Sequence, residues 1–279
     1  LAANEDPAFL RVKQANIGLS TECGGAKTSA NRACMTSDKP SMVVMGDSYA
    51  MHLVPGLSMS KNAGFIQFTE STCPPANRLG FYAPPKFGAL HAQKCIENNS
   101  SAIEYALAQD HVEVVVLSSS WSYQFHLEEA AIEENGKITL VEHSLSAFKK
   151  DMTELVDRLR AGGKRVVIVT GPPSPMNDAG KCNIRKQLNL IRIGRALDCT
   201  ISESQARERR ALPDKVIGEL QKGGIPVFWF YDAMCDSGTC FTELDGVILY
   251  RDFGHLTIDG ARYLGSKLDL YKTLFELAR

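Results

Sequence analysis

The sequence predicts an α/β protein, a three-layer sandwich in which helices cover both faces of a mainly parallel, five-stranded sheet. Short apolar runs rich in β-branched residues alternate with longer stretches whose apolar residues recur at helical spacing. Apolar runs of this kind are typical of strands that are buried on both faces, as in a parallel sheet. With 279 residues, of which 44% are apolar, the chain can bury the core that such a sandwich needs.

In the first half of the chain, apolar runs indicate the strands and helical spacing indicates the helices. Residues 112–117 form the most continuous β-branched run of this half, which indicates a buried strand. Residues 50–61 place Leu53 and Leu57 on one side, as a helix would. The elements expected here, in order, are a strand at 41–45, a helix at 50–61, a strand at 65–68, a helix at 95–109 and a strand at 112–117.

The second half repeats the alternation of helices and strands. Gly162 follows a helical pattern and Gly223 follows another, and both are expected to end their helices. The elements expected here, in order, are a helix at 145–160, a strand at 165–170, a helix at 202–221, a strand at 226–231 and a helix at 258–277. Ligands of such sheets bind at the carboxyl ends of the strands, so the segments that follow the strands are the candidate site.

Charge and composition exclude two classes of protein. The formal net charge is −1 and no basic stripe exists, which argues against a nucleic-acid partner. No apolar run approaches the roughly 18 to 20 residues that span a bilayer. Residues 1–40 lack apolar periodicity and are rich in small and polar residues, so we expect a linker or extension there and a separate domain at 41–279. The chain itself is expected to be cut from something longer or already processed.

The eight cysteines indicate the compartment. They fall into four sequence-local pairs in loop-forming stretches, although eight cysteines allow about 105 pairings. This arrangement favours disulfides and an oxidising compartment, and the alternative is buried thiols in a cytosolic protein. No Cys-x-x-Cys pair and no zinc-ligand spacing of histidines exists, so no metal site is predicted. The expected pairs are Cys23 with Cys34, Cys73 with Cys95, Cys182 with Cys199, and Cys235 with Cys240.

A serine follows the first expected strand, at the point where the chain turns into a helix. Gly46 permits a tight turn there, Asp47 can cap the helix, and Ser48 lies beside unpaired backbone N–H groups that could stabilise an oxyanion. The alternative is that the Gly-Asp-Ser triplet only caps the helix. His52 lies one helical turn after Ser48, and we expect it to have a surface or packing role.

An aspartate and a histidine lie three residues apart just before the last expected helix. With Gly254 between them, Asp252 and His255 can be presented together by one turn. An aspartate that accepts the imidazole Nδ1–H leaves Nε2 to take a proton from a serine hydroxyl. The alternative is structural: Asp252 starts a turn, and Thr257 or Asp259 caps the helix.

Together, the Gly-Asp-Ser after the first strand and the Asp-x-x-His-Leu before the last helix resemble the SGNH, or GDSL, hydrolase superfamily. The resemblance extends over residues 41–279 and implies the SGNH hydrolase fold. It implies that Ser48 is the nucleophile, and that Asp252 and His255 complete a catalytic triad.

The middle of the chain departs from this family's pattern. Members of the family supply oxyanion donors from a glycine after the second strand and an asparagine after the third. Residues 69–75 and 117–122 contain neither. The backbone N–H of Ser48 is still expected to serve as a donor. The candidates for the other donors are Ser71, Thr72, Ser120 and Trp121.

Two features, the Cys-Pro-Pro of residues 73–75 and a tryptophan, Trp121, after the third strand, make this chain resemble one group of SGNH domains. These are the SGNH domains attached to acyltransferase family 3 membrane proteins. This resemblance implies a periplasmic domain of an inner-membrane protein with a transmembrane acyltransferase partner. It implies that an acyl-Ser48 intermediate passes an acetyl group to a sugar hydroxyl of a bacterial surface polysaccharide such as lipopolysaccharide O-antigen. No cofactor is expected to be bound, and the acetyl donor is expected to derive from acetyl-CoA through the membrane partner.

Two other functions remain open from the sequence. A secreted or periplasmic carbohydrate acetylesterase would use the same triad, with water in place of the glycan acceptor. A non-catalytic glycan-binding SGNH module would explain the missing glycine and asparagine.

Overall fold

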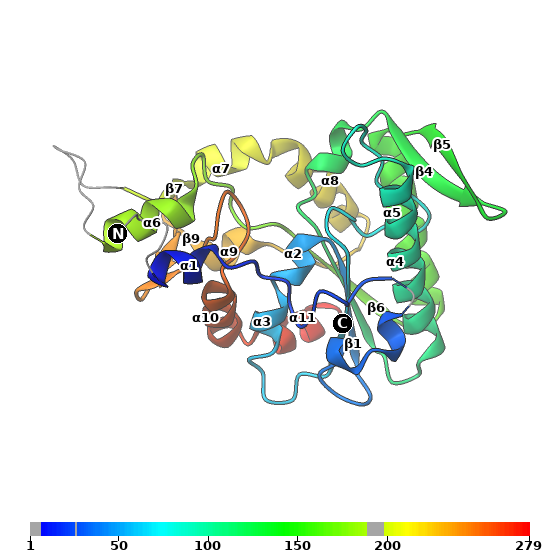
Figure 1. Cartoon of the computed structure of the whole chain (residues 1–279), viewed down its shortest axis with the longest axis horizontal. Helices are drawn as coiled ribbons and strands as arrows, with labels where there is room; N and C mark the ends of the chain where they lie inside the picture. Colours follow the sequence, from blue (N-terminus) through cyan, green and yellow to red (C-terminus); the bar gives the residue numbers. More distant parts are fainter. Residues whose placement is uncertain (1–6, 26, 189–197) are drawn as a thin grey trace.

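The computed structural model describes residues 7–25, 27–188 and 198–279, and its centre is a five-stranded sheet (Figure 1). All neighbouring strands of this sheet pair in parallel, in the order β2-β1-β3-β6-β8. The predicted parallel, five-stranded sheet is therefore confirmed. The strands are β1 (Met42–Gly46), β2 (Phe65–Thr69), β3 (Val114–Ser118), β6 (Arg165–Val169) and β8 (Val227–Phe228).

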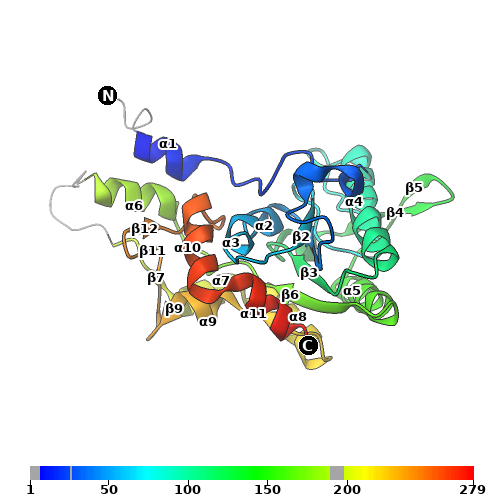
Figure 2. The same cartoon turned by 90° about the horizontal axis from the view of Figure 1, so that it is seen from below.

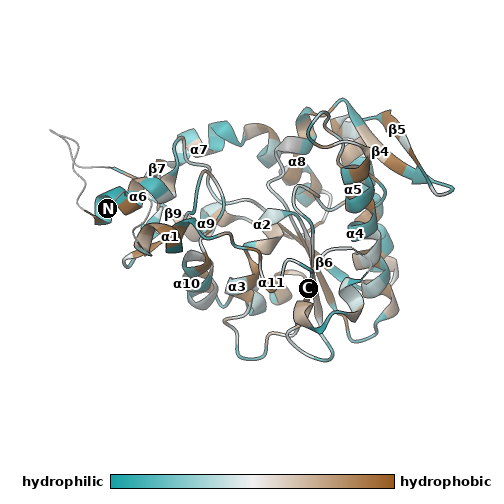
Figure 3. Cartoon of the chain, in the orientation of Figure 1, coloured by the Kyte–Doolittle hydropathy of each residue, from teal (hydrophilic) through white to brown (hydrophobic). Residues whose placement is uncertain are grey.

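Helices cover both faces of the sheet and form the outer two layers (Figures 1 and 2). Alternate residues of each strand face opposite cores, so that Val44 packs on one side and Val43 on the other. In Figure 3, the outlying ribbons of α4 and α5 carry hydrophilic colour along much of their length. One layer contains α2 (Ser48–Met51), α3 (Val54–Leu57), α10 (Ile258–Leu268) and α11 (Leu270–Leu277), and the other contains α4 (Ala89–Ala108), α5 (Leu145–Ala161) and α8 (Ala211–Lys222).

Three helices expected to be continuous are broken in the structure. The helix expected at 202–221 is interrupted at Arg210, which turns its buried guanidinium inward to donate to the Ser120 carbonyl oxygen at 3.2 Å. The helix expected at 258–277 is interrupted at Asp269, whose φ of 43° is left-handed. The third, expected at 50–61, is divided into α2 and α3, with Pro55 in the first turn of α3.

A β-hairpin that is not among the elements expected from the sequence projects from the body of the protein (Figures 1 and 2). Its strands β4 (Glu129–Glu134) and β5 (Lys137–Glu142) are joined by Asn135 and Gly136, which have φ values of 52° and 73°. This Asn-Gly pair between two strands is a strong hairpin signal in the sequence. Other short elements are α1 (Pro7–Lys13), α6 (Ala179–Gln187), α7 (Glu203–Arg209), α9 (Phe230–Met234), β7 (Ile201–Ser202), β9 (Cys235–Asp236), β10 (Thr239–Cys240), β11 (Glu243–Leu244), β12 (Val247–Ile248) and three 3₁₀ turns (Thr28–Ala30, Arg32–Cys34 and Tyr123–His126).

The described part of the predicted N-terminal extension packs against the rest of the protein. Helix α1 lies beside α6 (Figure 2). Farther along, Thr36 donates its N–H to the Phe65 carbonyl at 3.0 Å, and the Cys23 carbonyl accepts the Thr69 N–H at 2.7 Å. These contacts run along the outer edge of β2. The division of the chain at residue 40 stays a prediction, and residues 1–6 of the extension lie outside the described residues.

All four predicted disulfides are formed. Each joins residues at most 22 positions apart, so each closes a local loop. Among the residues that the structure describes, no helix is both long enough and apolar enough to cross a lipid bilayer.

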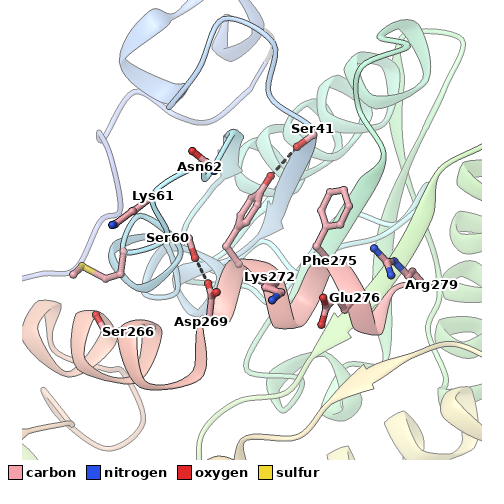
Figure 4. A pocket seen from close by; sticks show the side chains of 13 residues that line it. Ser41, Ser60, Lys61, Asn62, Ser266, Asp269, Lys272, Phe275, Glu276 and Arg279 are labelled. Carbon is pink, nitrogen blue, oxygen red and sulfur yellow. Dashed lines mark hydrogen bonds between the residues drawn. The ribbon is translucent and has the colours of Figure 1, made fainter.

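A cavity of about 710 Å³ opens between α11 and the loop that follows α3 (Figure 4). Ser41 lines it and shares a 2.7 Å hydrogen bond with the Tyr271 hydroxyl. Because Ser41 precedes β1 and Ser48 follows it, this cavity lies at the opposite end of the strand from the candidate nucleophile. None of Ser48, Asp252 and His255 lines it.

Gly46 is predicted to be indispensable at the end of β1. Its φ is 148°, and a Cβ placed there would lie 1.8 Å from the Ser118 carbonyl oxygen, which belongs to the backbone of the neighbouring strand. We expect Gly46→Ala to destabilise the protein by at least about 3 kcal/mol, because overpacking adds to backbone strain. Gly218→Ala is the control, since its Cβ would meet nothing within 4 Å in the interior of α8, and it should stabilise by about 0.5 to 1 kcal/mol. Thermal unfolding measures both, and an unchanged midpoint for Gly46→Ala would contradict the prediction.

Candidate active site

Ser48 is held at the carboxyl end of β1 by the carboxylate that precedes it. The side chain of Asp47 caps α2 by accepting the Tyr49 N–H at 2.8 Å. The same carboxylate accepts the Ser119 hydroxyl at 2.6 Å and the Ser120 N–H at 3.3 Å, both from the loop after β3. Burial raises the pKa of Asp47, and these hydrogen bonds oppose that rise. Asp47 therefore joins the serine turn to the neighbouring strand end.

The three predicted triad residues lie together although two of them are 207 positions apart. Ser48 Oγ lies 2.8 Å from His255 Nε2. On the other side of the ring, His255 Nδ1 lies 3.0 Å from each carboxylate oxygen of Asp252. An Nδ1 that faces a carboxylate carries the proton, which leaves the lone pair of Nε2 facing the serine hydroxyl. The arrangement is that of a serine hydroxyl, a base and an orienting carboxylate.

The turn that carries Asp252 and His255 is closed by hydrogen bonds to the aspartate itself. Asp252 Oδ1 accepts the backbone N–H groups of Gly254 at 3.0 Å and His255 at 2.9 Å. Arg251 donates to Oδ2 from Nε at 3.0 Å, and its Nη2 lies 2.9 Å from the same oxygen. Partial burial raises the pKa of Asp252, but the His255 hydrogen bonds and the Arg251 charge outweigh it and hold this pKa well below its ordinary value. The carboxylate is therefore ionised whenever the imidazole could act as a base.

The triad can be reached from solvent. The side chains of His255 and Asp252 are 24% and 26% exposed, and Ser48 is half-buried. The Tyr49 ring packs against His255, with ring centroids 4.7 Å apart. A Cβ on Gly254 would lie 2.2 Å from the Tyr49 hydroxyl oxygen, so this glycine lets Tyr49 approach the turn closely.

The predicted oxyanion donors differ in what they can offer. Within the described part of the chain, the Ser48 N–H has no recorded hydrogen-bond partner, which leaves it available. The Ser120 N–H is already bonded to Asp47. Trp121 is fully buried, its backbone N–H donates to Ser119 Oγ at 3.2 Å, and its Nε1–H donates to the Val169 carbonyl at 2.8 Å. The backbone N–H of Ser120 and both donors of Trp121 are therefore used inside the protein, which argues against Trp121 as an oxyanion donor. Ser120 stays a prediction through its hydroxyl, which accepts the Ser122 N–H.

Thr72 stays a predicted oxyanion donor. It lies in the turn after β2 with a left-handed φ of 60°. Its carbonyl oxygen faces the His91 ring, with Nε2 at 3.4 Å. Glu70, two residues before Thr72, donates its N–H to the Gly46 carbonyl at 3.1 Å, so this turn adjoins the end of β1.

Three residues that contact the triad segments were not identified as functional from the sequence. Arg251 binds the triad aspartate. His52 is fully buried, and its ring accepts the N–H of Leu256, the residue after His255. Asn16, from the predicted extension, donates to the His52 carbonyl oxygen. His52 has the only advance signal among them, its position one helical turn after Ser48.

Cys73, His91 and Cys95 lie close enough together to hold a metal ion. Cys73 and Cys95 are joined in a disulfide, however, and so supply no thiolate. This grouping therefore offers only the His91 imidazole as a ligand.

The fold is similar to solved structures of acyl-group enzymes. The periplasmic domain of a lipopolysaccharide acetyltransferase from Salmonella ser. Paratyphi A is 19% identical, with a TM-score of 0.65 over 97% of this chain and 98% of that one. The M. smegmatis aryl esterase is 13% identical, with a TM-score of 0.42 over 85% and 98% of the two chains. A putative acylhydrolase from Bacteroides fragilis is 11% identical, with a TM-score of 0.40 over 100% and 99%. At these identities, the first of these likenesses shows the fold alone.

Comparison of the sequence with protein families gives a more direct result. No curated protein matches the chain significantly. The profile of the family described as "SGNH domain (fused to AT3 domains)" matches residues 22–269, so it includes Ser48, Asp252 and His255 and also begins within the predicted extension. Because this match spans most of its length, the chain belongs to the family of SGNH domains that are fused to AT3 domains.

Proposed function

We propose that this protein is a serine-dependent O-acetyltransferase domain, with Ser48 as nucleophile, His255 as general base and Asp252 as the residue that orients it. The observation that carries the proposal is the 2.8 Å contact between Ser48 Oγ and His255 Nε2, with Asp252 on the opposite side of the ring. The family's fusion to AT3 domains supports an acyl-group reaction beside a membrane partner.

The reaction proceeds in two half-reactions. His255 Nε2 takes the proton of the Ser48 hydroxyl as Oγ bonds to the carbonyl carbon of the acyl donor. The oxyanion that forms is stabilised by the Ser48 N–H. The bond to the donor's leaving group then breaks, and that group takes the proton from His255.

In the second half-reaction, an acceptor hydroxyl attacks the acyl-Ser48 carbonyl and gives its proton to His255. Collapse of this intermediate breaks the bond to Oγ, and His255 returns the proton to Ser48. We propose that the acceptor is a sugar hydroxyl of a bacterial surface polysaccharide such as lipopolysaccharide O-antigen. The acetyl group would derive from acetyl-CoA through the AT3 partner. The printed description of the Salmonella neighbour, a lipopolysaccharide acetyltransferase periplasmic domain, supports this acceptor class.

We further propose a periplasmic location. The four disulfides favour an oxidising compartment, because cytosolic thiols are kept reduced. The acceptor polysaccharide and the membrane partner would both be accessible there.

A carbohydrate acetylesterase is the second candidate. The solvent exposure of His255 and Asp252 favours this function, because water can reach the acyl intermediate. About a quarter of the surface of each side chain is exposed. In a transferase, the acceptor must be held in line to compete with water, which effective molarities of positioned groups permit.

Removal of the nucleophile is the first test. Wild-type protein incubated with an activated acetyl ester should gain a single acetyl adduct on Ser48 in intact-protein mass spectrometry. Ser48→Ala should lose the adduct, and ester turnover should fall on the order of 10⁴- to 10⁶-fold because the covalent route is gone. Ser58→Ala is the control, since its exposed hydroxyl donates to the Val54 carbonyl within the same helix.

Retained turnover in folded Ser48→Ala would remove Ser48 from the mechanism. Glycan binding by wild-type protein that shows neither adduct nor turnover would favour a binding module.

The orienting role of Asp252 makes a second prediction. Asp252→Asn should lower the rate of Ser48 acylation by about 10³- to 10⁴-fold, because the amide no longer fixes the tautomer that leaves Nε2 free. Asp157→Asn, an exposed residue of α5, should leave the rate unchanged. Stopped-flow release of the ester's leaving group measures both rates. Equal rates in wild type and Asp252→Asn would exclude the proposed triad.

Transfer and hydrolysis are separated by the fate of the acyl group. With increasing polysaccharide acceptor, acetylated sugar should increase at the expense of free acetate, and NMR measures both products. An acetate yield that stays complete at every acceptor concentration would identify an esterase.

A further inference from the structure

The triad requires two distant segments of the chain to be held in register. Ser48 begins α2, and His255 lies in the turn before α10, 207 positions later. The hydrogen bond between their side chains is one contact between these segments. A nucleophile and base that must meet at hydrogen-bond distance need a more rigid support than their own contact, because small misplacements lower the rate strongly.

His52 contacts both segments at once. Its backbone N–H donates to the Ser48 carbonyl oxygen at 3.1 Å, within the same helical turn. Its ring Nδ1 accepts the backbone N–H of Leu256 at 3.2 Å, and Leu256 follows His255 directly. One residue thus connects the backbone of the nucleophile to the backbone beside the base.

The chemistry of this contact fixes the state of the His52 ring. An Nδ1 that accepts a hydrogen bond carries no proton, so the ring is neutral with its proton on Nε2. The ring is 1% exposed, and burial lowers its pKa well below the ordinary value. Among the described residues, Nε2 has no hydrogen-bond partner. Within that part of the chain, the ring is therefore held by the hydrogen bond that its Nδ1 accepts from Leu256.

The packing around His52 limits how it can move. Its ring centroid lies 5.0 Å from that of Tyr49, and it meets Phe230 and His255 edge-on at 6.5 Å and 6.2 Å. Because Nδ1 accepts from Leu256 and Nε2 has no partner among the described residues, the His52 ring does not make the hydrogen bond to the Ser48 hydroxyl that a base would make. The ring packs against Tyr49 and His255, and its Nδ1 accepts the Leu256 N–H.

Asn16 closes the same junction from the other side. Its Nδ2 donates to the His52 carbonyl oxygen at 3.2 Å and lies 3.5 Å from the carbonyl oxygens of Leu256 and Thr257. The side chain is buried. Residues 52 and 256 are thus joined twice, by the His52 ring and by the Asn16 amide.

We propose that His52 is a positioning residue, which sets the separation of Ser48 Oγ and His255 Nε2 by holding the Leu256 N–H on its neutral ring. This inference rests on the proposed function, because it concerns the rate at which Ser48 is acylated. His52 acts through the backbone of Leu256 and touches no reacting atom.

Two substitutions separate this hydrogen bond from packing. His52→Leu fills the apolar surroundings but offers no acceptor, whereas His52→Asn places Oδ1 where Nδ1 was, as an acceptor for the Leu256 N–H. At saturating activated ester, we expect His52→Leu to lower the Ser48 acylation rate by about 10- to 100-fold, with KM within about twofold, because the base is displaced rather than the ester site. His52→Asn should recover most of the rate. His52→Leu at the wild-type rate, or His52→Asn as slow as folded His52→Leu, would overturn the proposal.

The tautomer of His52 gives a second measurement, which does not depend on the variants folding. In ¹⁵N spectra of the wild-type protein at neutral pH, with the ring resonances assigned through their bonds to the assigned backbone, His52 should show an unprotonated Nδ1 and a protonated Nε2. A protonated Nδ1 would overturn the proposal. Wild-type protein that shows this tautomer but never acylates Ser48 would instead overturn the proposed function, so the two failures are distinguishable.

Discussion

The buried carboxylate of Asp47 is the contact on which the candidate site depends. It lies where β1, the loop after β3 and the start of α2 meet, and it accepts hydrogen bonds from each of the last two. An unpaired buried carboxylate would cost several kcal/mol, so these bonds are required as well as available. The result is a rigid turn that presents Ser48 at the carboxyl end of a central strand. The same carboxylate, which caps α2, also accepts the Ser120 N–H, so this N–H points toward Asp47.

The sheet was predictable because its strands are apolar on both faces, and runs such as Val114–Ser118 have few other structures available. Helix continuity was not predictable, because it depends on distant partners. Arg210 lies between α7 and α8, where its guanidinium reaches the Ser120 carbonyl in the loop after β3, and no periodicity in 202–221 indicates that contact. The hairpin at Asn135 and Gly136 is different, since its signal was present in the sequence and was missed.

The site shows the same division. Ser48, Asp252 and His255 could be placed together because two local motifs, each at a strand or helix end, resemble one family. The direction in which an N–H donor points depends on tertiary contacts, and both N–H donors of Trp121 are bonded inside the protein. Asn16 could not be found at all, because it lies 240 positions from the Leu256 carbonyl that it approaches.

The N-terminal segment has a consequence beyond the site. β2 is an edge strand, and the Thr36 N–H and the Cys23 carbonyl occupy backbone groups on its outer side. An uncovered edge strand is a template for pairing with another molecule. A domain trimmed at residue 40 would lose these bonds and expose the backbone groups of Phe65 and Thr69 to such intermolecular pairing, so its self-association would increase.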